Sequence, residues 1–159
     1  MSVDRWTRTL RATRSRVYRA LLDPDAVQQW MVPNGMTSRV ERFEAREGGA
    51  FRISLTYEVP TTAGKTTAQT DTFQGRFVSL VPDTEIVEAV EFETDDPLMQ
   101  GEMTITYRLA DAPGGGTELE AVHDDVPPGV SPADNDLGWN ISLDKLTQLV
   151  EAGPSESGA

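Results

Sequence analysis

The pattern of hydrophobic and polar positions divides the chain into two short helical segments, a long middle part and one long helical segment. Val17, Ala20 and Leu21 recur at the spacing of one helix face, which predicts a first helix. Asp23-Pro24 ends this helix and starts a second one, because Asp caps a helix and Pro fits its first turn. Trp30 lies on the apolar face of the second helix.

The middle part of the chain predicts antiparallel strands. Phe51, Ile53 and Leu55 alternate with polar residues, which is typical of a strand with one buried face, and Gly48-Gly49 indicates a hairpin before it. Short turns rich in Gly, Pro and Asp separate the strands, so strands next to each other in sequence must pair in antiparallel fashion. The predicted strands are 6–10, 51–57, 67–80, 85–93, 102–109 and 117–124.

A long helix is predicted near the end of the chain. Its start at Ser131-Pro132-Ala133-Asp134 combines an N-cap serine, a proline in the first position and an acidic residue in the third. An apolar stripe begins at Trp139, and Gly153-Pro154 ends the helix. We expect residues 153–159 to form a disordered tail.

These elements predict an α+β fold. A sheet of six or seven antiparallel strands with one apolar face needs a cover, and the C-terminal helix is the predicted element long enough to provide it. Two short helices near the N-terminus close one end. We expect residues 1–152 to form one domain, in which the curved sheet and the helix leave an internal cavity.

Composition and charge exclude several classes of function. The chain has 159 residues, and 14 Lys and Arg stand against 26 Asp and Glu, which gives a net charge of -12. Such a surface repels phosphate and anionic lipid, so neither nucleic acid nor a membrane is an expected partner. With no cysteine and a single histidine, no metal site or cofactor is expected. A bilayer-spanning run and a signal sequence are both missing, so we expect a cytoplasmic protein, as a monomer or homodimer.

The first twenty residues are basic although the chain as a whole is acidic. These arginines would either bind an acidic partner or a second copy, or form a solvated edge that pairs with the protein's own carboxylates. We favour the second interpretation. The residues are Arg5, Arg8, Arg11, Arg14, Arg16 and Arg19.

Several stretches of the sequence resemble the bacterial SRPBCC, or START-like, superfamily, and most of all the group named after the activator of heat-shock protein 90 ATPase. The resemblance implies a helix-grip fold, similar to that of the birch-pollen allergen, often with a pocket for a small hydrophobic or aromatic molecule. It implies no common catalytic set. The stretches are VYRALLDPDAVQQWM (17–31), EGGAFRISLTY (47–57), TDTFQGRFVSLVPDTEIVEAVEFETDDPLMQGEMTITYRL (70–109) and HDDVPPGVSPADNDLGWNISLDKLTQLVE (123–151).

Two titratable residues are predicted to face the interior. His123 is in phase with Ala121 on the last strand, and it would be a polar contact or proton-transfer group at the cavity mouth, or a strand-end histidine bonded to a nearby backbone group. We favour the backbone-bonded histidine, since a general base needs a partner and a placed substrate. Glu88 is in phase with Ile86 and Val90, so either it faces the cavity as a functional candidate, or a bulge or the exposed end of the strand lets it reach water.

Aromatic and polar residues at strand or helix spacing are candidates for the cavity lining, although the core is the favoured place for most of the aromatic ones. Gly138 is a glycine inside a helix, which costs up to ~1 kcal/mol relative to alanine. Close approach of the sheet or of a ligand would explain it. The candidate ligand-binding residues are Trp30, Phe51, Ile53, Phe73, Phe92, Tyr107, His123, Asn135, Trp139 and Ser142.

Three functions follow from these observations, in order of preference. The first is a protein that binds a small hydrophobic molecule between the sheet and the C-terminal helix. The second is an enzyme of the cyclase or dehydratase kind, which needs a convergent acid and base pair such as Glu88 and His123. The third is a co-chaperone that stimulates a chaperone ATPase, as some eukaryotic relatives with an additional chaperone-binding domain do.

Overall fold

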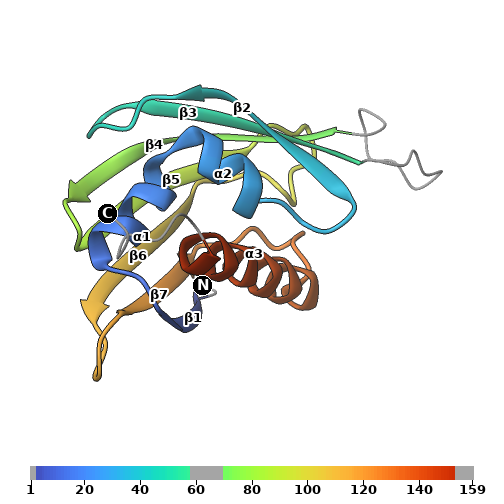
Figure 1. Cartoon of the computed structure of the whole chain (residues 1–159). Coiled ribbons are helices and arrows are strands. Elements are labelled where there is room, and N and C mark those ends of the chain that lie inside the picture. Colours follow the sequence, from blue (N-terminus) through green and yellow to red (C-terminus); the bar gives the residue numbers. More distant parts are fainter. Residues whose placement is uncertain (1–2, 58–69, 153–159) are drawn as a thin grey trace.

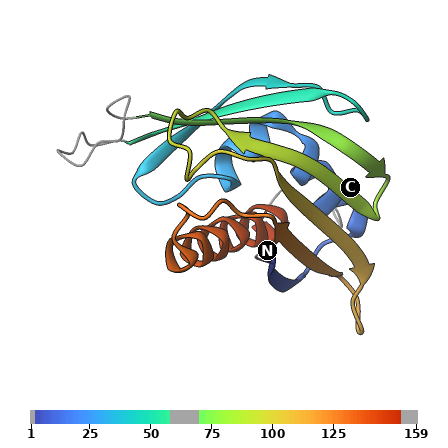
Figure 2. The same cartoon turned by 180° about the vertical axis from the view of Figure 1, so that it is seen from behind.

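Antiparallel strands form a strongly curved sheet whose concave side holds the helices (Figures 1 and 2). The computed structural model describes residues 3–57 and 70–152, and in this part of the chain seven strands pair in the order β1-β7-β6-β5-β4-β3-β2. The strands are β1 (Val3–Leu10), β2 (Met36–Phe43), β3 (Ala50–Tyr57), β4 (Thr70–Val81), β5 (Glu85–Phe92), β6 (Met103–Asp111) and β7 (Thr117–Asp124).

The second and third helices begin at the capping residues that the sequence indicates. Helix α1 (Arg14–Leu22) starts after Thr13, and the side chain of Asp23 accepts a hydrogen bond in the first turn of α2 (Pro24–Trp30). The hydroxyl of Ser131 accepts a hydrogen bond from the backbone N–H of Asp134, 3.3 Å away, at the start of α3 (Pro132–Ala152). No helix in the described residues is long and apolar enough to cross a membrane.

The predicted α+β helix-grip arrangement is confirmed, with α3 lying across the concave side of the sheet (Figure 1). Strand β2 was not among the predicted strands, because it is an edge strand with few buried side chains. The first residues of predicted strand 67–80 and the predicted tail 153–159 lie outside the described residues.

Hydrogen bonds and apolar contacts fix the helices against each other and against the sheet. The indole N–H of Trp30 donates to the backbone oxygen of Ala20 at 3.0 Å, which joins α2 to α1. The amine of Lys145 in α3 donates to the backbone oxygen of Val32, at 2.7 Å, just after α2. The buried side chains in the second half of α3 extend the core between the sheet and the small helices, and they are Leu143, Leu146 and Val150.

The sheet bends sharply along β4. Gly75 leaves no room for a side chain, because a methyl group there would overlap the backbone oxygen of Ala89 and lie 2.8 Å from the ring of Phe51. Three residues later the pairing of β4 with β5 shifts by one residue, so Val78 bulges outward and is exposed. A bulge of this kind increases the local twist, which helps the sheet to close around α3.

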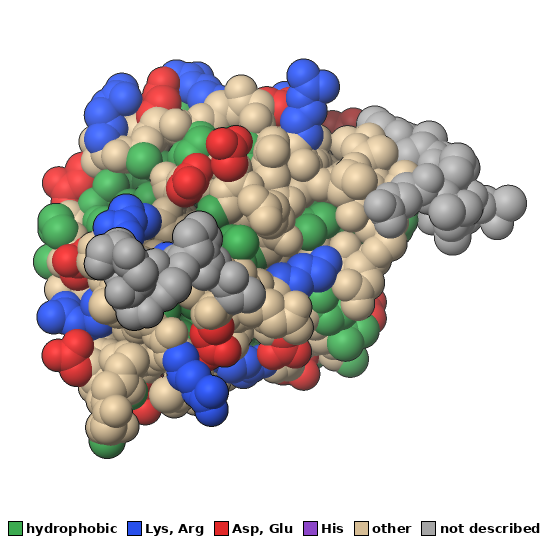
Figure 3. Space-filling view, in the orientation of Figure 1, with side chains coloured by type: hydrophobic (Ala, Val, Ile, Leu, Met, Phe, Trp, Pro, Cys, Tyr) green, Lys and Arg blue, Asp and Glu red, His purple; other side chains and the backbone are tan. Residues whose placement is uncertain are grey.

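Of the six arginines in the first twenty residues, Arg5, Arg8 and Arg14 form ion pairs with the protein's own carboxylates in the described part of the chain, which is pairing of the kind that the favoured interpretation predicted. Ion pairs join Arg5 to Glu120 at 3.1 Å and Arg14 to Asp111 at 2.9 Å. Figure 3 shows positive and negative side chains interspersed on one face of the molecule. Exposed pairs of this kind contribute little to stability, but they leave no continuous basic patch on this face.

We expect Gly75→Ala to lower the free energy of unfolding by about 1–3 kcal/mol, because the added methyl group must push the backbone of β5 away. Gly138→Ala is the matched control: a methyl group at Gly138 meets no atom within 4 Å, and alanine favours the helix. Urea unfolding of both variants measures the difference. Equal effects of the two substitutions would contradict this description of β4.

Candidate functional site

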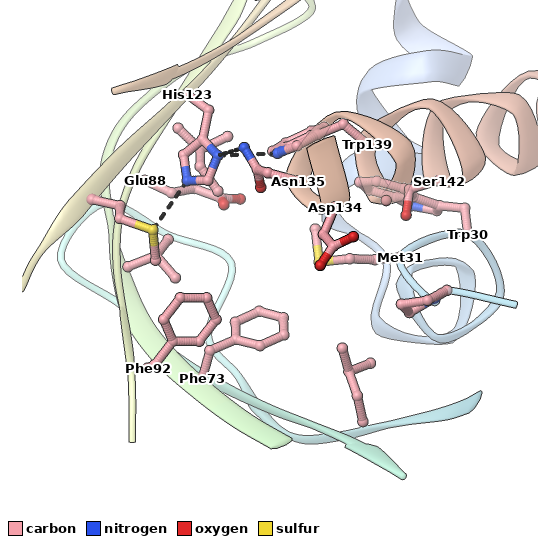
Figure 4. Close-up of a pocket in the computed structure, with 16 residues that line it drawn as sticks. Trp30, Met31, Phe73, Glu88, Phe92, His123, Asp134, Asn135, Trp139 and Ser142 are labelled. Atoms are coloured by element: carbon pink, nitrogen blue, oxygen red, sulfur yellow. Dashed lines mark hydrogen bonds between the residues drawn. The ribbon is translucent and has the colours of Figure 1, made fainter. Parts of the chain in front are cut away.

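A pocket with a volume of about 200 Å³ lies between the first half of α3 and the concave face of the sheet (Figure 4). It is at the end of the sheet where β3, β5 and β7 finish and where β4 and β6 begin. A dry cavity of ~150 Å³ is enough to hold a benzene molecule. The pocket therefore has room for a molecule of one or two rings.

Both walls of the pocket follow from local periodicity. On α3, Asn135, Gly138, Trp139 and Ser142 are three or four residues apart, so they form one stripe that faces the sheet. On the sheet, inward-facing residues of neighbouring strands lie side by side. The end of α2, with Trp30, closes the third side.

Seven of the ten predicted ligand-binding residues lie together in the pocket lining. The strands contribute Phe73, Phe92 and His123, and α2 contributes Trp30. Their roles in binding a ligand remain predictions. From α3 come Asn135, Trp139 and Ser142.

Phe51, Ile53 and Tyr107 do not line this pocket but lie in the hydrophobic core. Phe51 packs on Phe77 with ring centroids 5.1 Å apart, and Tyr107 packs edge to face against Trp30 at 6.3 Å. The alternation of each strand predicts which face a residue occupies, but residues on one face are ~6.6 Å apart along the strand. Sequence periodicity therefore does not predict how far along the sheet the pocket lies.

Eight further residues line the pocket that the sequence did not assign to it. The alternation of strand residues could have identified two of them. Leu55 follows Ile53 on the same face of β3, and Ile105 precedes Tyr107 on the same face of β6. The eight are Met31, Pro33, Leu55, Val90, Met103, Ile105, Asp134 and Gly138.

Gly138 borders open space in the pocket. Close approach of the sheet is therefore not the reason for a glycine here, since an added Cβ would meet no atom within 4 Å. The absence of a side chain at this position enlarges the pocket on the helix side.

His123 is buried, with 4% of its surface exposed, and its ring is held by side chains. The indole N–H of Trp139 donates to Nδ1 at 3.1 Å, and the amide of Asn135 lies 3.3 Å from the same nitrogen (Figure 4). Because an indole N–H can only donate, Nδ1 accepts and the proton of the neutral ring is on Nε2, 3.1 Å from the sulfur of Met103. The favoured prediction of a bond to the backbone was wrong, because the partners come from α3 and β6.

Burial lowers the pKa of His123 to about 4, although the carboxylates of Asp4 and Asp124 act in the opposite direction. Protonation of Nδ1 would also break the hydrogen bond from Trp139. The ring is therefore neutral at pH 7. Since the unfolded chain takes up this proton at about 6.5, the contribution of His123 to stability is lost as the pH falls from about 6.5 through 4.

Glu88 faces the pocket, and only 5% of its surface is exposed. Figure 4 shows its carboxyl group pointing into the cavity from the sheet. The bulge considered as an alternative lies on β4 at Val78, next to Glu88 and not at it. Within residues 3–57 and 70–152 the carboxyl group has no hydrogen-bond or ion-pair partner, and burial raises its pKa to about 8.

Glu88 and His123 lie in one row across the sheet, with Ile105 between them. Glu88 pairs with Ile105 across β5 and β6, and Ile105 pairs with His123 across β6 and β7. Neighbouring strands are ~4.8 Å apart, so the two backbones are separated by roughly 10 Å. Both side chains face the same pocket, but no hydrogen bond joins them.

The pocket lining is mostly apolar, and it contains two acidic residues. No lysine or arginine lines it in the described part of the chain, while buried Glu88 points in from the sheet and Asp134 of α3 is exposed to solvent (Figure 4). Among the described residues no group of three or more potential metal ligands is assembled.

Comparison with known proteins gives a family match and similar structures. Residues 11–151 match the family described as Activator of Hsp90 ATPase homolog 1-like protein. A protein from Chromobacterium violaceum is 33% identical, with a TM-score of 0.83 over 98% of this chain and 100% of that chain. An AHSA1-like protein from Aeromonas hydrophila is 19% identical, with a TM-score of 0.71 over 95% and 93%. No curated protein is similar enough to match.

We expect NMR to show a neutral His123 ring down to about pH 5, with the proton on Nε2 and a midpoint near 4. The measurement is direct, because the chain has a single histidine and its ring signals need no assignment. In Trp139→Phe, which keeps an aromatic ring but removes the indole donor, the midpoint should rise. A midpoint near 6.5 in the unaltered protein would contradict the assigned hydrogen bonds.

We expect Glu88→Gln to be more stable than the unaltered protein at pH 9 by a few kcal/mol, with about 5 kcal/mol as the upper limit. The pKa of Glu88 is raised in the folded state, so its contribution to stability is present below about 4.5 and is lost as the pH rises through about 8. Urea unfolding at pH 5, 7 and 9 tests this. Glu118→Gln, an exposed position on β7, is the control and should show no such trend.

Proposed function

The chain belongs to the family described as Activator of Hsp90 ATPase homolog 1-like protein, and we propose that it binds a small, mostly hydrophobic molecule between α3 and the sheet. The observation that carries the proposal is the pocket itself. Its walls are largely aromatic and aliphatic, and the α3 stripe that faces the sheet there does not fill the space. An apolar pocket with a few convergent polar groups is typical of a binding site for a small molecule.

Gly138 supports this proposal independently of the pocket lining. A helical glycine is less stable than alanine by up to ~1 kcal/mol, and the methyl group of an alanine would meet no atom within 4 Å here. A bound molecule that needs this space would account for the glycine.

The arrangement of the titratable groups supports binding over catalysis. An enzyme of the cyclase or dehydratase kind needs an acid and a base that both reach the reacting part of one substrate. Nδ1 of His123 already accepts from Trp139, and Nε2 lies 3.1 Å from the sulfur of Met103, so both ring nitrogens are engaged within the protein. We therefore rank the enzyme second.

A role as a chaperone activator ranks third. The family description refers to such an activity, but a shared fold does not carry a function with it. Addition of the protein to a purified bacterial homologue of heat-shock protein 90 tests this role, and we expect no increase in the rate of ATP hydrolysis.

The pocket is tested with naphthalene, a neutral two-ring probe. We expect saturable binding that shifts the indole N–H signals of Trp30 and Trp139 in NMR spectra, since both side chains line the pocket. Gly138→Leu fills the pocket from the helix side and should weaken binding at least about tenfold. Gly138→Ala provides the control for helix stability and should have a smaller effect. Equal binding to the unaltered protein and Gly138→Leu would argue against this pocket.

A further inference from the structure

Glu88 is an unusual residue for a pocket that holds only apolar molecules. Only 5% of its surface is exposed, and its carboxyl group points into the cavity (Figure 4). In the described part of the chain nothing pairs with the carboxyl group. A buried, unpaired polar group carries a cost in stability, and a ligand group that bonds to it would remove that cost.

The groups around Glu88 offer it no positive charge. His123 is neutral, because Nδ1 accepts from Trp139 and the ring is buried. The buried hydroxyl of Tyr107, which has no partner among the described residues, is another neutral group near this carboxyl. The other acidic residue of the lining, Asp134 of α3, is exposed to solvent. The described lining therefore offers an anion no partner, whereas the carboxyl group of Glu88 becomes a partner for a cation when it gives up its proton.

We propose that the ligand of this pocket is a hydrophobic amine, whose ammonium group pairs with the carboxylate of Glu88 while its ring or chain packs on the aromatic walls. This inference rests on the binding function proposed above and names the chemical class of the ligand. The rings of Trp30, Phe73, Phe92 and Trp139 line the pocket, and aromatic faces also attract cations. A carboxylate or a phosphate would find no positively charged partner in the described lining.

Binding of the amine includes the transfer of one proton. At pH 7 the carboxyl group of Glu88 is mostly protonated, since burial raises its pKa to about 8. When the ammonium ion enters, the carboxyl proton leaves to solvent and a carboxylate and ammonium pair remains. Affinity for the amine should therefore rise between pH 6 and 8. The other titratable groups that face this site are Tyr107, His123 and Asp134.

Four probes with the same ring system test the proposal by calorimetry: 2-methylnaphthalene, 2-naphthylmethanol, 2-naphthylmethylamine and 2-naphthoate. We expect the amine to bind at least about tenfold more tightly than the methyl and alcohol probes, and the carboxylate to bind weakest. At pH 7, the dependence of the binding enthalpy on the buffer should show release of close to one proton per amine bound. The neutral probes should release none.

The ratio of amine to methyl-probe affinity is then measured in variants. In Glu88→Gln the amine should bind no more tightly than 2-methylnaphthalene, whereas Glu118→Gln, on the exposed side of β7, should keep the full ratio. The His123 ring signals show whether each variant keeps the native pocket.

The outcomes separate the two proposals. If 2-methylnaphthalene binds and the amine binds no better, or if Glu88→Gln keeps the preference, the amine proposal is overturned and the binding function stands. An alcohol probe that binds as tightly as the amine also overturns it, since a neutral donor would then satisfy Glu88. If no probe binds, the binding function itself fails.

Discussion

The contact between Trp139 and the sheet is the interaction on which both the fold and the pocket depend. Its indole stacks on Trp6 of β1, with centroids 5.0 Å apart and planes 17° from parallel, and lies 6.0 Å from the ring of Tyr107 in β6. Its N–H donates to His123 of β7. One side chain of α3 is thus fixed by three strands, and the same side chain forms a wall of the pocket. Beyond it, Leu146 and its neighbours fill the core completely.

Two departures from ordinary stability rules face the same cavity. Glu88 buries a carboxyl group that has no partner among the described residues, and Gly138 weakens a helix where an alanine would fit. Local choices that oppose folding are expected mainly where function requires them. His123 shows the contrast, because its buried ring has partners on both nitrogens and contributes to holding the structure together.

Much of the fold was predictable because it depends on local rules. Asp23-Pro24 and Ser131 are residue types that favour the start of a helix, and a helix begins at each of them. The alternation along the strands predicted that Glu88 and His123 face inward. The position of the pocket along the sheet was not predictable, since Ile53 and Leu55 share a face and only packing with α3 separates core from lining. The hydrogen-bond partners of His123 come from β6 and α3, and the periodicity of β7 does not predict which residues of other elements pack against it.

The pairing of β1 with β7 also has a consequence for biosynthesis. Arg5 and Glu120, which form an ion pair across these strands, are 115 positions apart in the chain. During synthesis on the ribosome, β1 therefore emerges long before β7, the strand with which it pairs. Trp6 can pack only after both β7 and Trp139 have been synthesised. The sheet can close and hold α3 only after β7 and α3 have been synthesised. Such long-range pairing is characteristic of proteins that fold in milliseconds to seconds, and the open sheet is the stage most exposed to aggregation.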